Sequence, residues 1–131
     1  EAALAMGYQG VQIGTQLIAA AESGIATASK QVFVNATPDD VVVIRSPVGL
    51  PVRVLRTPLV ERVLAGKREP FTCPYRCLRT CNPRKAPFCI AKALLATWSG
   101  DVEHGLFMTG CNVGAIKNIY PLAEFFRSLE G

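Results

Sequence analysis

The chain has 131 residues, of which 50% are hydrophobic, and a formal net charge of +4. This supply of apolar side chains is sufficient for the core of one globular domain and argues against disorder. No uncharged apolar run reaches the roughly 18 residues that a membrane span needs, and no basic leader with an apolar core is visible. We therefore expect a cytoplasmic protein that acts neither in a membrane nor on nucleic acid, for which no aromatic-interleaved basic motif is present.

The first residues predict a helix, a turn and a strand. Alanines up to Met6 favour a helix that Gly7 ends. Gly10 to Gly14, with the sequence Gly-Val-Gln-Ile-Gly, is predicted to be a short strand. A lone parallel strand exposes both of its edges. We therefore expect residues 11–13 to pair with another chain or to lie under helices of this one.

Two helices are expected after this strand. Thr15 can cap an apolar helix over 16–21, and another helix is predicted over 26–35. Where a strand passes directly into a helix, free backbone N–H groups can hold a phosphate, and Gly14 lets it approach closely. The alternative is a plain turn with Thr15 as the helix cap.

A hairpin is predicted after the turn Pro38-Asp39-Asp40. Two β-branched runs, 41–45 and 52–56, flank a loop that contains proline and glycine. A helix is then expected from Thr57 and Pro58 to Ala65.

The C-terminal part is predicted to be mostly helical. An amphipathic helix is expected over 88–98, with Trp98 in the core, and a last helix over 121–129. Between them, the glycines of residues 106–116 suggest a loop that passes close to a ligand or to another backbone. His104, the only histidine, is expected in an exposed loop rather than as a general base.

Four of the five cysteines lie close together, as Cys73, Cys77, Cys81 and Cys89. If 73–81 is helical, the first three thiols share one stripe. Four thiolates suit tetrahedral zinc or an iron–sulfur cluster, and neighbouring cations would lower the thiol pKa values. Buried free thiols and a redox disulfide remain alternatives, because the spacing lacks the usual C-x2-C pattern.

Basic residues gather in the same segment, opposed there by Glu69 alone. Such a patch can meet an acidic carrier protein or a phosphate, or be a solvated face with no partner. Its members are Lys67, Arg68, Arg76, Arg79, Arg84, Lys85 and Lys92.

The stretch from Ala2 to Gly24 resembles the last barrel repeat of the nitronate monooxygenase and FMN-dependent enoyl-acyl-carrier-protein reductase family. The shared pattern is an Ala-rich helix, Gly-x-x-Gly-Val-Gln-x-Gly-Thr, and a helix that ends in Glu-Ser. Further similarity covers Lys30, the Asp39-Asp40 turn, 49–56 and 100–110.

This resemblance implies an α/β chain that forms the C-terminal part of a (β/α)8 TIM barrel, with an added, mostly helical, Cys-rich C-terminal segment. It implies FMN as cofactor, with Gly14 and Thr15 on its phosphate and Gln12 nearby. The family's second phosphate-binding turn and its catalytic histidine lie in earlier strands. We therefore expect no catalytic residue in this chain and no activity from the chain alone.

Residues 1–37 are predicted to be the last barrel repeat, 38–66 a hairpin and helix excursion, and 67–131 the Cys-rich segment.

The resemblance favours oxidation of alkyl nitronates, a small-molecule substrate. An alternative is a reductase that passes a hydride from NAD(P)H to an enoyl thioester. Cys111 stands where the reductases often have glutamine, which leaves the substrate open.

Two further alternatives are a metal or iron–sulfur module without catalysis of its own, and an inactive remnant of a larger protein. A homo-oligomer is compatible with each of these interpretations.

Overall fold

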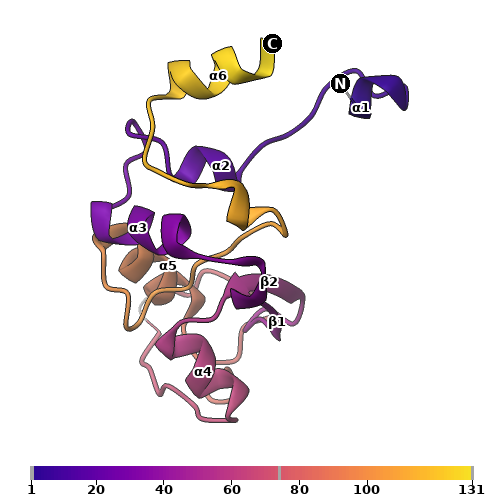
Figure 1. Cartoon of the computed structure of the whole chain (residues 1–131). Helices are drawn as coiled ribbons and strands as arrows, with labels where there is room; N and C mark the ends of the chain where they lie inside the picture. Colours follow the sequence, from indigo (N-terminus) through magenta and orange to yellow (C-terminus); the bar gives the residue numbers. More distant parts are fainter. Residues whose placement is uncertain (1, 74, 131) are drawn as a thin grey trace.

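The computed structural model describes residues 2–73 and 75–130 (Figure 1). No helix among these residues is both long and apolar enough to cross a membrane. The elements are α1 (Ala2–Ala5), α2 (Thr15–Ile18), α3 (Thr27–Asn35), the 3-10 turn η1 (Pro38–Asp40), β1 (Val41–Arg45), β2 (Pro51–Leu55), α4 (Pro58–Leu64), α5 (Ile90–Ser99), the 3-10 turn η2 (Val113–Ala115) and α6 (Leu122–Glu130).

The predicted hairpin is present and forms the sheet of the described chain. β1 and β2 are antiparallel, with Val41 opposite Leu55 and Arg45 opposite Pro51. Gly49 has φ +91, a left-handed conformation that favours glycine, and its N–H closes the connecting loop on the Ser46 carbonyl at 2.9 Å.

Two hydrophobic clusters form the core, and β2 contributes to both. Val54 belongs to the cluster with α4 and α5, while its neighbour Leu55 faces the cluster with α2 and α3. Leu106 and Phe107 divide in the same way, because successive side chains of an extended segment point to opposite sides. The Leu55 N–H donates to the Phe107 carbonyl at 2.9 Å, so this later segment lies along β2.

The predicted strand from Gly10 to Gly14 is wrong. These residues form no strand, and within this chain they are neither paired nor fully covered, since Val11 is 67% exposed. Pairing of residues 11–13 with another chain stays a prediction. A parallel strand needs a neighbour to satisfy its backbone, and the described residues hold no other parallel strand. Figure 1 shows the result: an extended arm carries α1 away from the rest of the molecule.

The helices after this arm are present with shifted ends. α2 is a single turn that begins at Thr15, so Thr15 is the first helical residue and not its side-chain cap. α3 and α4 lie within one or two residues of their predicted bounds. Gly66 follows α4 with φ +72, as expected for a residue that ends a helix.

Residues 73–81, where the structure describes them, are not helical, so the first three thiols do not share a helical stripe. Residues 71–88 are turns and irregular backbone wherever the structure describes them, and regular helix begins only with α5 at Ile90. The prediction that Trp98 lies in the core is also wrong, since it is 60% exposed. α5 packs through Ala93 and the partly buried Ile90, and its other large apolar residues, Leu94, Leu95 and Trp98, are exposed.

Candidate functional site

The turn from Gly14 to Thr15 is bonded to a distant glycine loop. The Gly110 N–H donates to Thr15 Oγ1 at 2.9 Å. A Cβ atom on Gly110 would lie 3.4 Å from this oxygen, which is van der Waals contact. The prediction that the loop over 106–116 passes close to another backbone is confirmed at β2, where the Thr109 N–H donates to the Arg53 carbonyl at 3.1 Å. At Gly110 the same loop meets the Thr15 side chain of the predicted phosphate turn.

The three residues predicted to bind a cofactor share one cavity. Gln12, Gly14 and Thr15 line a hollow of about 280 Å³ on one side, and Gly110 and Asn112 line it on the other. Sequence reasoning did not find Asn112, although its place in the glycine loop was a usable signal.

Hydrogen bonds of Tyr120 and Glu22 hold the C-terminal segment next to this cavity. Its hydroxyl donates to the Gln16 carbonyl at 2.6 Å, and burial raises the pKa of the phenol, so it remains a donor at neutral pH. The Glu22 carboxylate accepts the Leu122 N–H at 3.0 Å. These bonds seat α6 beside α2 (Figure 1), and Phe125 of α6 reaches the cavity lining.

The lining suits a group held by backbone rather than by charge. No Lys, Arg, Asp or Glu contributes to it. A Cβ on Gly14 would meet nothing within 4 Å, so a ligand can approach the backbone there directly. The first N–H groups of a helix have no partner inside it, and Thr15 and Gln16, the first two residues of α2, line this cavity. Backbone donors with the Thr15 hydroxyl are a set that fits the phosphate of FMN.

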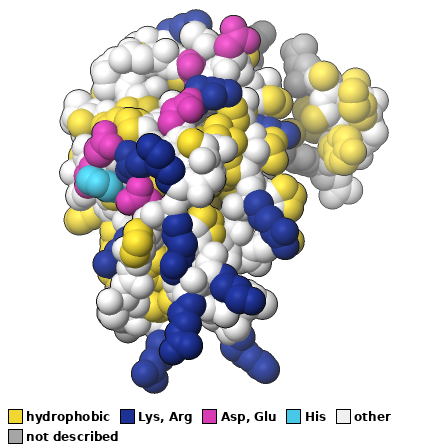
Figure 2. Space-filling model, turned by 90° about the horizontal axis from the view of Figure 1, so that it is seen from below, with side chains coloured by type: hydrophobic (Ala, Val, Ile, Leu, Met, Phe, Trp, Pro, Cys, Tyr) yellow, Lys and Arg dark blue, Asp and Glu magenta, His cyan; other side chains and the backbone are white. Residues whose placement is uncertain are grey.

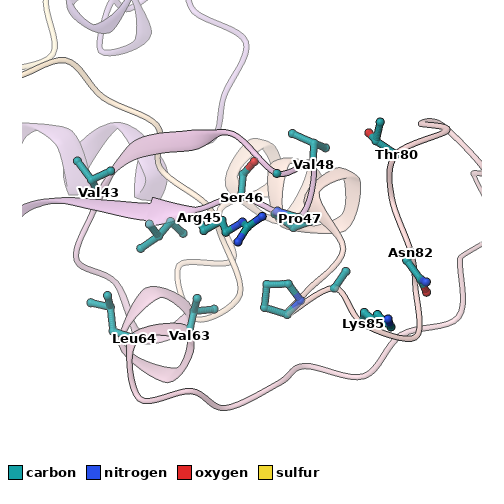
Figure 3. Close-up of a pocket in the computed structure, with 14 residues that line it drawn as sticks. Val43, Arg45, Ser46, Pro47, Val48, Val63, Leu64, Thr80, Asn82 and Lys85 are labelled. Atoms are coloured by element: carbon teal, nitrogen blue, oxygen red, sulfur yellow. The ribbon is translucent and has the colours of Figure 1, made fainter.

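A larger cavity of about 740 Å³ lies between the hairpin loop, α4 and residues 80–87 (Figure 3). Arg45 and Lys85 bring positive charge to it, and Val63 lines it from α4. Ser46 also lines it, and its Oγ is buried without a hydrogen-bond partner. Sequence reasoning missed this cavity because it depends on how the hairpin loop meets the Cys-rich segment.

The cysteines gather without forming a site for a single ion. Cys73, Cys77 and Cys81 line one hollow of about 380 Å³, Cys89 is buried at the start of α5, and all are free thiols. Burial, and then the charges of the other three, raise the pKa of Cys81. No group of three or more His, Cys, Asp or Glu within 2–73 and 75–130 is spaced to hold one metal ion.

His104 is an exposed loop residue, as predicted. Its Nδ1 lies 2.9 Å from the Asp101 carboxylate. The hydrogen bond from His104 lowers the pKa of Asp101, so this carboxylate stays charged. Neither residue lies at the Gly14 cavity, and the structure gives His104 no catalytic partner there.

The basic residues of the Cys-rich segment point outward. All seven predicted members of the patch are exposed. Glu69, the one acid among them in sequence, is bound by Arg62 at 2.5 Å. In Figure 2, Lys and Arg side chains project from the lower half of the face, while acidic ones gather above. The patch therefore keeps its positive charge.

In this α/β chain a glycine turn opens a helix beside a cavity, an arrangement that in other proteins can bind phosphate. Similarity to known proteins gives the family. The sequence profile named "Nitronate monooxygenase" matches residues 1–130, and the chain belongs to this family.

Solved structures agree with this assignment. FabK from Thermotoga maritima has a TM-score of 0.71 and 33% sequence identity, over 98% of this chain and 40% of FabK. A methionine-to-alanine mutant of that protein has a TM-score of 0.65 and 28% identity, over 98% of this chain and 38% of its own. The chain therefore spans about two fifths of the length of these proteins.

A curated relative is the (3aS,4S,5R,7aS)-5-hydroxy-7a-methyl-1-oxo-octahydro-1H-indene-4-carboxyl-CoA dehydrogenase of Mycobacterium tuberculosis. It is 40% identical over 67 residues, which are 51% of this chain and 19% of the dehydrogenase.

Proposed function

We propose that this chain is the C-terminal portion of an FMN-dependent oxidoreductase, and that its Gly14 cavity holds the flavin phosphate. The observation that carries the proposal is the hydrogen bond from the Gly110 N–H to Thr15 Oγ1. This bond brings two glycine segments, distant in sequence, to one cavity that Gln12 also lines.

Each residue has a distinct part in this arrangement. Gly14 leaves space for the phosphate to reach the backbone, and Thr15 can donate its hydroxyl to a phosphate oxygen while it accepts from Gly110. Gln12 lies at the same hollow, where its amide can hydrogen-bond the cofactor. The bound flavin would supply the redox chemistry, and the protein its position and access.

The family favours alkyl nitronates as substrates, which are small molecules. A second candidate is reduction of an enoyl thioester at the expense of NAD(P)H. The exposed cations of the Cys-rich segment support it, because an acidic carrier protein would be attracted to them. Two measurements on the same protein distinguish the two activities. Nitronate-dependent oxygen consumption supports the first, and thioester-dependent NAD(P)H oxidation supports the second.

The test of the cofactor site is a pair of substitutions at Thr15. Thr15→Val removes the hydroxyl and leaves the Gly110 N–H without its acceptor, so FMN should bind about tenfold more weakly. Thr15→Ser keeps the oxygen and should bind as the parent does. Flavin fluorescence titration of the natural full-length protein measures both affinities.

Equal FMN affinity in the parent, Thr15→Val and Thr15→Ser would place the phosphate elsewhere. Thermal unfolding of the flavin-free forms checks that Thr15→Val still folds. A loss of FMN that follows only a loss of fold would also count against the proposal.

A further inference from the structure

The Cys-rich segment has features that the flavin site does not use. Cys73, Cys77 and Cys81 face one hollow from a loop without regular structure. Cys89 follows at the first residue before α5, where it is buried and lines a neighbouring hollow. Three free thiols therefore share one hollow, and the fourth follows a short way along the chain.

Their spacing argues against a single metal ion. Two thiolates on one zinc can be no more than about 4.6 Å apart, because each Zn–S bond is about 2.3 Å. Among the described residues, no group of three or more His, Cys, Asp or Glu side chains is placed to hold a metal ion. In an iron–sulfur cluster of four irons and four sulfides each thiolate binds a different iron, so the four cysteine sulfurs lie farther apart around a larger body. The hollow of about 380 Å³ has room for a group larger than one ion.

The surroundings suit a negatively charged group. Arg76 and Arg79 line the hollow with the thiols, and no carboxylate does. Arg76 also has φ +44, a conformation that costs a non-glycine residue energy and often marks a functional site. Arg68 donates to the Ala86 carbonyl at 2.9 Å and so braces the loop between Cys81 and Cys89.

From this geometry we propose that Cys73, Cys77, Cys81 and Cys89 bind an iron–sulfur cluster. Each thiol loses its proton on binding, and each sulfur becomes the ligand of one iron. The site is separate from the Gly14 cavity, so it does not depend on the flavin proposal.

The test is the metal content of the protein purified without oxygen and incubated with equal amounts of ferrous and ferric iron and with sulfide. We expect about four iron atoms and four acid-labile sulfides per chain, with broad visible absorption. Cys77→Ser should lose most of this iron. Cys77 is exposed, so its substitution leaves the packing intact. Cys111→Ser is the matched control, since Cys111 is also exposed but lies outside the cluster, and should keep the full iron content.

Three results would overturn the proposal: one zinc without sulfide, no bound metal, or equal iron in Cys77→Ser and the parent. Circular dichroism of the metal-free forms shows whether Cys77→Ser is folded. FMN content, measured on the same samples, should be equal in both variants.

Discussion

Single hydroxyl groups hold the segment after α5 in place, over both short and long separations in the chain. Thr15 accepts from Gly110, and Thr97 Oγ1 bonds to the Leu106 carbonyl at 2.9 Å. Both link a helix to the loops that follow α5. The sequence showed Thr15 as a site residue, but only as a helix cap or a phosphate ligand. Its bond to Gly110 could not be predicted, because no local pattern encodes a contact over that separation.

Asp40 gives a pH-dependent contribution to stability. Its carboxylate accepts the Thr37 N–H and hydroxyl, each at 2.8 Å, and the backbone bond is the larger cause of its lowered pKa. A lowered pKa means that the stabilisation is complete above the unfolded value and is lost as pH falls through the folded value.

We expect Asp40→Ala to cost about 1 kcal/mol of unfolding free energy at pH 7. The difference from the parent should shrink below the ordinary pKa of 3.8. Urea unfolding at pH 7 and at about pH 3 measures both. Asp39→Ala, at the exposed neighbour, is the control and should change little. A difference that stays constant with pH would refute the assigned role of this carboxylate.

At the scale of elements, α3 and α5 are held together at their ends. The Ala26 N–H donates to the Trp98 carbonyl at 3.0 Å, and the buried Ser29 hydroxyl donates to the Thr97 carbonyl. Gly100 is left-handed with φ +93, and a Cβ there would lie 3.0 Å from Ala26 Cβ. The contact between α3 and α5 thus needs a residue without a side chain at position 100 and hydrogen-bond donors for the Thr97 and Trp98 carbonyls.

Ser29→Ala should lower the free energy of unfolding by about 1–2 kcal/mol, because it leaves the Thr97 carbonyl without its donor. Gln31→Ala, on the exposed face of α3, should change it by less than about 0.5 kcal/mol. Chemical denaturation of both variants measures these values. An equal effect of the two would mean that the buried bond contributes nothing specific.

Elements with local signals were predictable from the sequence. The hairpin, α3, α4 and α6 have turn residues or an initial proline at their ends, and these signals act over a few residues. The strand over 10–14 failed because a parallel strand depends on partners. Trp98 was misplaced because α5 packs through alanine, which periodicity of large apolar residues does not reveal.

At the scale of the whole molecule, the arm before α2 has few contacts with the rest of the described chain. The backbone hydrogen bonds of residues 2–8 are local, and Leu4, Met6 and Val11 are all largely exposed. The same arm brings Gln12 to the cavity. The solved relatives are longer, since the chain covers 40% of FabK. The resemblance predicts that this arm is a strand of a barrel. Among the described residues no strand lies beside it, so its position depends on contacts that this sequence does not encode.

The most direct test of the flavin proposal is the amount of FMN per chain in the natural full-length protein. The flavin is released by denaturation and quantified by fluorescence after incubation with excess FMN and removal of the free cofactor. Our account predicts about one FMN per chain. A folded full-length protein that retains no flavin would contradict it.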